Sequence, residues 1–138
     1  MTPGFKTAFA WLFRLVSAII MLQTLFFKFT AAPESVFIFS ELGMEPWGRI
    51  ATGAMEFIAS LLILIPRTTA VGALLALGVM TGAILSHLLF LGIQIQGDGG
   101  QLFIYALLVF ISSFILLVWY RRQLFTLLAA GRGPANVV

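Results

Sequence analysis

Four long apolar runs dominate this sequence and decide what it can fold into. They extend roughly over residues Ala8–Phe29, Trp47–Ile65, Thr69–Ile93 and Gln101–Tyr120. Each is close to the ~20 residues that an α-helix needs to cross ~30 Å of hydrocarbon at 1.5 Å per residue. Because backbone groups that face lipid must be hydrogen-bonded within their own segment, runs of this length predict helices. The sequence therefore predicts an all-α fold, a four-helix transmembrane bundle.

The composition supports the membrane class. Of the 138 residues, 61% are hydrophobic and 9% are charged, whereas a soluble domain carries about 25% charged residues. The length suits a single transmembrane domain over residues 1–138. The absence of cysteine excludes a disulfide, a CxxC redox pair and a thiolate metal site. The net charge of +3 comes from basic residues at the ends of apolar runs, a pattern that indicates membrane orientation rather than nucleic-acid binding.

The connections between the runs differ in length. The segment "PRT", residues 66–68, predicts a tight antiparallel turn, and residues 94–100 form a short polar turn. The longer first connection contains "PESVFIFSEL" followed by Gly43, which predicts a short extracytoplasmic helix with a proline start and a glycine stop. The tail from Ala129 onward is expected to be frayed. The first run contains Arg14 and Lys28 and is too long for a signal peptide.

Charged residues in the connections predict the orientation. The basic residues on one side are Lys6, Arg67, Arg121, Arg122 and Arg132. The loops on the other side carry Glu34, Glu41, Glu45 and Asp98. Because loops rich in lysine and arginine stay in the cytoplasm, both termini and the "PRT" turn are predicted to be cytoplasmic.

Ionisable side chains inside the runs are the candidate functional residues. Glu56 lies near the middle of "RIATGAMEFIASLLILIP", and an unpaired carboxylate at that depth is costly. Arg14 and Lys28 share one face of the first helix, and His87, the only histidine, lies late in the third. Depth estimates from helical rise place Glu56 and His87 about one turn apart in the outer half. Glu56 is therefore predicted to meet His87, Arg14 or Lys28.

The fourth run adds Tyr105 and Gln101 to this predicted cluster, on one face near the outer end. The alternatives are structural. An ion pair could serve only to fix helix order, and Lys28 could simply reach the headgroups. One histidine without cysteine makes a poor metal or haem site, so no metal is expected. Small residues in the third run are more consistent with close helix packing than with chemistry. These are Gly72, Ala76, Gly78, Gly82 and Ser86.

Three segments resemble the DoxX-like membrane proteins. They are "FRLVSAIIMLQTLFFKF", "GAMEFIASLLILIPRTT" and "GAILSHLLF", and the resemblance covers roughly residues 8–122 with Arg14, Lys28, Glu56 and His87 in order. The resemblance implies a four-helix protein of the bacterial inner membrane. Some members of the family are subunits of quinone-linked oxidoreductases, such as those acting on thiosulfate, and others are linked to redox-stress complexes.

These observations lead to three hypotheses of function. The first is a redox-associated membrane subunit that binds a quinone-like or other amphipathic ligand. In it, Glu56 and His87 handle protons while Arg14 or Lys28 holds a carbonyl or anionic group. No catalytic motif and no cofactor site within the chain is predicted, so the protein is at most a membrane subunit of an oxidoreductase. The expected partners are the lipid bilayer and either a second copy or a redox subunit. The other hypotheses are a small proton-coupled transporter and a non-catalytic membrane scaffold or assembly protein.

Overall fold

The computed structural model describes residues 3–131, and within them the chain is all α-helical. The helices are α1 (Pro3–Phe29), α2 (Pro33–Glu41), α3 (Trp47–Leu64), α4 (Thr69–Ser86), α5 (Gln101–Trp119) and α6 (Arg121–Gly131). A 3₁₀ turn, η1 (Pro66–Thr68), joins α3 to α4, and a π-helical segment, η2 (His87–Leu91), extends α4.

The four predicted spans are confirmed as helices. By length and composition, four segments can cross a membrane: Gly4–Phe29, Trp47–Leu64, Pro66–Leu91 and Gln101–Trp119. The third span differs from the uniform helix expected, because α4 ends at Ser86 and the chain continues as η2. Gly92 follows with φ +80, a conformation that glycine adopts without steric cost, and ends the span there. The protein is therefore a multi-pass membrane protein.

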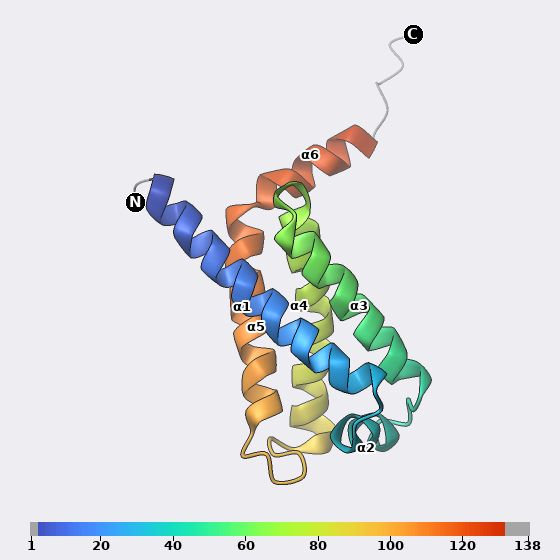
Figure 1. Cartoon of the computed structure of the whole chain (residues 1–138). Coiled ribbons are helices and arrows are strands. Elements are labelled where there is room, and N and C mark those ends of the chain that lie inside the picture. Colours follow the sequence, from blue (N-terminus) through green and yellow to red (C-terminus); the bar gives the residue numbers. More distant parts are fainter. Residues whose placement is uncertain (1–2, 132–138) are drawn as a thin grey trace.

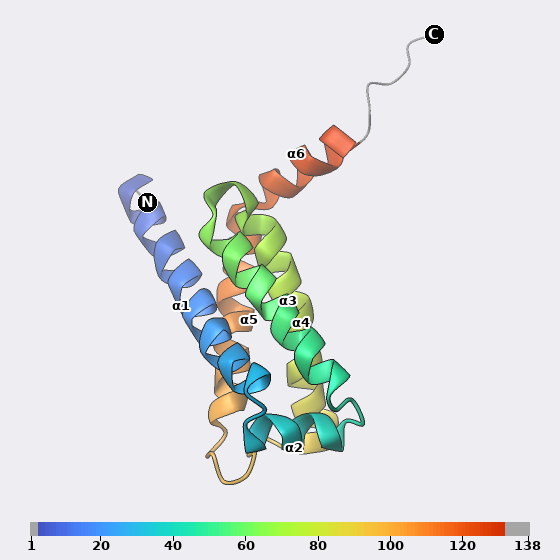
Figure 2. The same cartoon turned by 45° about the vertical axis from the view of Figure 1, so that its right-hand side comes forward.

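The four long helices form an antiparallel bundle (Figures 1 and 2). Helix α1 packs against α3 and α5, and α4 packs against the same two helices. The turn η1 forces α3 and α4 to be antiparallel neighbours, as predicted. Helix α2 lies across one end of the bundle beside the α4–α5 loop, and both termini of the described chain lie toward the other end.

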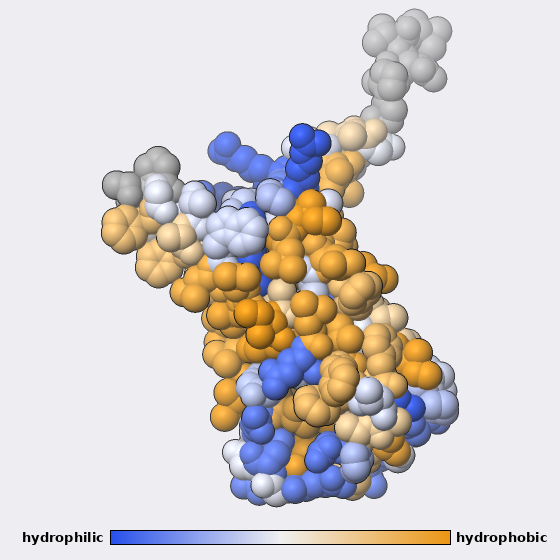
Figure 3. Space-filling model, viewed as in Figure 1, coloured by the Kyte–Doolittle hydropathy of each residue, from blue (hydrophilic) through white to orange (hydrophobic). Residues whose placement is uncertain are grey.

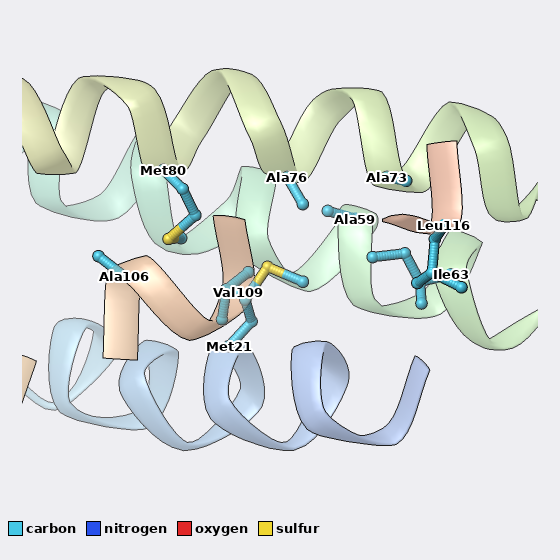
Figure 4. Packing of buried hydrophobic residues seen from close by; sticks show 9 residues of the cluster. All are labelled: Met21, Ala59, Ile63, Ala73, Ala76, Met80, Ala106, Val109 and Leu116. Carbon is cyan, nitrogen blue, oxygen red and sulfur yellow. The ribbon is translucent and has the colours of Figure 1, made fainter. Parts of the chain in front are cut away.

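The core combines small side chains with larger aliphatic ones. Four of the nine core residues are alanines, and Figure 4 shows them between α3, α4 and α5 together with Met21 of α1. Gly72 marks the closest approach of α3 and α4, since a Cβ there would lie 2.6 Å from the backbone nitrogen of Ile63. Close packing of small residues is the usual way in which membrane helices gain van der Waals contact. The packing prediction for Gly72 and Ala76 is therefore confirmed.

The outer surface is apolar, as a bilayer requires. Ile19 is 60% exposed and Phe114 is 54% exposed, and many other large apolar side chains also point outward. On the face seen in Figure 3, the middle of the molecule is mostly apolar and polar residues gather mainly at its two ends. Contact with lipid explains why apolar side chains point outward, because a surface in hydrocarbon needs no polar side chains.

The two ends of the bundle differ from each other. The short helix predicted between the first two spans is α2, and Gly43 follows it with φ +70. The other end carries α6, which no sequence pattern predicted. The expectation of a frayed tail from Ala129 is wrong for residues 129–131, which complete α6. Residues 132–138, with Arg132, lie outside the described residues.

Candidate functional site

An ion pair between α1 and α3 lies inside the bundle. Lys28 Nζ is 3.1 Å from Oε1 and 3.0 Å from Oε2 of Glu56, so it donates to both carboxylate oxygens. The Glu56 side chain is 3% exposed and that of Lys28 is 15% exposed. Thr24, one turn before Lys28, donates from Oγ1 to Glu56 Oε2 over 3.4 Å. The prediction that Glu56 has an ionic partner is confirmed, and the partner is Lys28.

Local features of both helices bring these two residues together. A Cβ on Gly53 would lie 2.9 Å from the ring of Phe29, so this glycine lets the end of α1 approach α3 one turn before Glu56. Arg49 donates from its guanidinium to the backbone carbonyl of Lys28, and this bond holds the C-terminal turn of α1. Arg49 also pairs with Glu45 over 2.8 Å. The Arg49–Glu45 pair therefore helps to hold Lys28 in position for its pair with Glu56.

A cavity of about 590 Å³ opens beside the Lys28–Glu56 pair. The spans and α2 all contribute to its wall, which is mostly apolar. Gly78 and Gly82 of α4 line it, and a Cβ on either would meet nothing within 4 Å. These two glycines were predicted to pack against a helix. They instead leave space for the cavity, because no neighbouring helix covers them in the described part of the chain.

His87 lines the same cavity from the start of η2. Its Nδ1 lies 2.9 Å from the carbonyl oxygen of Gly92, and its ring packs edge-on against Phe103 at 5.5 Å. A carbonyl oxygen only accepts hydrogen bonds, so Nδ1 carries the proton and a neutral ring keeps Nε2 as an acceptor. The π-helical turn produces this arrangement because Gly92 N–H bonds back to His87 at 2.7 Å. Such π-helical segments are common at functional sites.

Tyr105 and Gln101 of α5 are two further polar residues of the wall. Gln101 Nε2 donates to the Tyr105 hydroxyl oxygen over 2.7 Å. The phenol therefore accepts one hydrogen bond and keeps its own O–H available as a donor. Five of the six predicted site residues, namely Lys28, Glu56, His87, Gln101 and Tyr105, line this one cavity.

Arg14 is the predicted site residue that the structure does not bring to the cavity. It lies fourteen residues before Lys28, about 21 Å along α1. It is 3% exposed, and its guanidinium carbon lies 4.7 Å from the ring centroid of Trp11 and 5.0 Å from that of Tyr120. Cation–π contacts of this kind stabilise a buried charge near the opposite end of the bundle.

Sequence reasoning missed several residues of the cavity wall. Thr24 bonds to Glu56, and its position one turn from Lys28 could have indicated this. Asp98 accepts hydrogen bonds from the backbone N–H groups of Ile95, Gly100 and Leu102 at 3.0, 2.8 and 3.2 Å. Partial burial raises the pKa of Asp98, but these three bonds prevail and hold the pKa below its ordinary value. No sequence pattern marked this turn as part of the wall.

Similarity to known proteins adds a family to this architecture. No curated protein and no solved structure matches the chain. The sequence model described as the DoxX-like family matches residues 12–115, more than half of the chain. The matched region runs from α1 into α5 and contains the five predicted site residues that line the cavity. The chain therefore belongs to the DoxX-like family.

Proposed function

We propose that this protein is a redox-associated subunit of the bacterial inner membrane that binds a quinone-like, amphipathic ligand in the cavity. The observation that carries the proposal is the buried Lys28–Glu56 pair beside a mostly apolar space of about 590 Å³. Sites for small ligands usually have 300–1,000 Å³, apolar walls and a few convergent polar groups. All three properties meet here.

The chemistry of the wall fits such a ligand. A quinone head has two carbonyl oxygens that accept hydrogen bonds, and its tail is apolar. Lys28 Nζ and the Tyr105 hydroxyl are donors on different helices, α1 and α5. The apolar remainder suits a ring and a tail, and methionines in it adapt to irregular shapes.

Two groups are assigned to proton handling. His87 offers Nε2 as an acceptor, and Glu56 offers a carboxylate that Lys28 and Thr24 hold in place. A bound quinone would supply two-electron carrier chemistry, with the electrons coming from a redox partner protein. The role of this chain is to bind the head group, orient it and exchange protons at Glu56 Oε and His87 Nε2.

The cavity reaches the surface that faces lipid. Phe27 and Met55 line it and are 44% and 39% exposed, and Gly78 and Gly82 are exposed as well. A hydrophobic ligand dissolved in the bilayer would enter from the side, without crossing water. This access favours a membrane-soluble ligand over a polar one.

We propose the following orientation for the molecule. The end that carries Lys6, Arg67, Arg121 and Arg122 faces the cytoplasm, and α2 and the cavity lie toward the outer side.

Binding of a short-chain quinone to the purified protein tests the proposal. The readout is quenching of the three tryptophans, none of which lines the cavity, and extraction of co-purifying quinone. Gly82→Leu fills the cavity and should weaken binding at least tenfold. Gly4→Leu is the matched control, because Gly4 also has open space around it but lies away from the cavity.

A second experiment removes the charge of Glu56. Glu56→Gln should weaken binding, whereas Glu41→Gln on exposed α2 should not. Equal binding by the wild type, Gly82→Leu and Glu56→Gln would overturn the ligand site and leave a structural role for the pair.

A further inference from the structure

Helix α6 has no role in the proposed ligand site. It leaves the basic end of the bundle at an angle to the spans and extends away from them (Figures 1 and 2). Phe125 is 64% exposed, Leu127 50% and Leu128 66%. An isolated helix of this length is marginal in water, so an apolar face of this size needs a surface to bury it.

The first turn of α6 is fixed to the bundle. Gln123 Nε2 donates to the carbonyl oxygen of Pro66 over 2.6 Å, and its Oε1 accepts from Ala70 N–H over 3.0 Å. Pro66 lies in η1 and Ala70 in the first turn of α4, so both partners belong to the α3–α4 corner. These two hydrogen bonds fix the direction in which α6 leaves the bundle. They therefore also fix the position of its apolar face relative to the ends of the spans.

Charge is strongly segregated along the bundle axis. The five acidic residues are Glu34 and Glu41 in α2, Glu45 between α2 and α3, Asp98 in the loop before α5, and Glu56, which pairs with Lys28 at the end of α1 that leads into α2. The exposed cations at the end with α6 are Lys6, Arg67, Arg121 and Arg122. Within residues 3–131, none of these four forms a salt bridge with a described carboxylate.

We propose that α6 lies in the headgroup layer of the membrane and, with the neighbouring cations, forms a binding site for anionic phospholipids. Phe125 and Leu128, one turn apart, enter the acyl boundary. Arg121, Arg122 and Arg67 contact lipid phosphates, each surface cation favouring anionic lipid by about fivefold. A second copy of this chain is disfavoured as the occupant, because a symmetric contact would bring the same cations together. The inference is independent of the proposed ligand site.

Site-directed spin labels test where α6 lies. The chain has no cysteine, so Leu128→Cys and Thr126→Cys each give a unique label on the full-length protein. The two positions are about 200° apart around the helix and so face opposite ways. In nanodiscs of phosphatidylglycerol and phosphatidylcholine, the label at 128 should be accessible to oxygen and protected from a water-soluble nickel reagent. The label at 126 should show the reverse. Equal access of both labels to the nickel reagent would overturn the proposal.

Lipid selectivity tests the cations. The double variant Arg121→Gln, Arg122→Gln should lower the enrichment of phosphatidylglycerol over phosphatidylcholine about 25-fold, measured by native mass spectrometry from mixed nanodiscs. The matched control neutralises two charges at the other end, Glu34→Gln and Glu41→Gln, and should retain the enrichment. Unchanged enrichment in the arginine variant, or a label at 128 that is protected by protein contact in a dimer, would also contradict the proposal.

Discussion

The Lys28–Glu56 pair joins two spans that are separated in sequence by α2, namely α1 and α3. Both charges are largely removed from water, so each depends on the other. Removing one partner leaves an unpaired buried charge. Replacing both by apolar groups removes the attraction between the charges but also the cost of taking them out of water. The pair is therefore tested by comparing single and double variants.

We predict that Lys28→Met and Glu56→Leu each lower the free energy of unfolding by about 3–5 kcal/mol. The double variant should regain most of this loss, because no buried charge remains. Detergent-induced unfolding followed by circular dichroism measures all three, and the double-mutant cycle gives the coupling free energy. Additive losses would show that the two side chains do not interact in the folded bundle.

Asp98 gives a prediction about pH. Its pKa is lowered in the folded protein, so its carboxylate stabilises the fold fully above the ordinary pKa of about 4. That stabilisation is lost as the pH falls through the folded pKa. Asp98→Asn should cost about 1–3 kcal/mol at pH 7. The gap in melting temperature from wild type should narrow as the pH falls below about 4 and should close only below the lowered pKa of the folded protein. A gap that stays constant from pH 7 to pH 3 would contradict this assignment.

The sequence predicts much of the site and misplaces one residue. Helical rise and the shared face of Lys28 with its neighbours placed it among three possible partners of Glu56, because a helix fixes both depth and direction. Arg14 was the third expected partner, but it lies about 21 Å from Lys28 along α1, too far to reach Glu56. Its aromatic partners, Trp11 and Tyr120, come from the ends of two spans, and hydropathy does not reveal their pairing.

At the scale of elements, the α3–α4 contact depends on Gly72. A methyl group there would lie 2.6 Å from Ile63 N and 2.9 Å from Ala59 O, both backbone atoms that cannot rotate away. Gly78 lies on the same helix, and a methyl group there would meet nothing within 4 Å. Two glycines of one helix therefore have opposite environments, a tight contact and an open wall.

We predict opposite effects for the same change at these glycines. Gly72→Ala should destabilise the bundle by about 1–3 kcal/mol through overpacking. Gly78→Ala should be neutral or stabilise by up to about 1 kcal/mol, because alanine is the better helix former. Detergent-induced unfolding of both variants gives the comparison. If Gly78→Ala were as harmful as Gly72→Ala, Gly78 would have to contact another chain.

The lengths of the apolar runs predicted where the spans begin and end. They did not predict the π-helical turn at the end of the third span or the helix that follows the fourth. The spans and α2 were predictable because hydropathy, proline and glycine mark them. Helix α6 was missed because its 11 residues are too few to span a membrane and follow directly on α5, with Tyr120 alone between the two helices. The π-helical turn η2 was missed because it depends on the bond from Gly92 to His87, a local geometry with no apolar signature.

At the scale of the whole molecule, the separation of charges predicts a fixed orientation. Alkaline phosphatase, which folds only outside the cytoplasm, should be inactive when fused after residue 138 and active when inserted at Gly97. Gly97 is an exposed loop residue at the end away from α6. Activity from the C-terminal fusion with none from the loop insertion would reverse the orientation.

Methionines are gathered at the cavity wall. Of the five methionines, all four in the described residues line the cavity: Met21, Met44, Met55 and Met80. Oxidants convert the thioether to a polar sulfoxide. Met55, 39% exposed, would be converted before Met80, 5% exposed, and Met21, which is fully buried. Oxidation by peroxide would thus make the wall polar from its exposed residues inward. Methionine sulfoxide reductases reverse this oxidation, so the change in the polarity of the wall would be reversible.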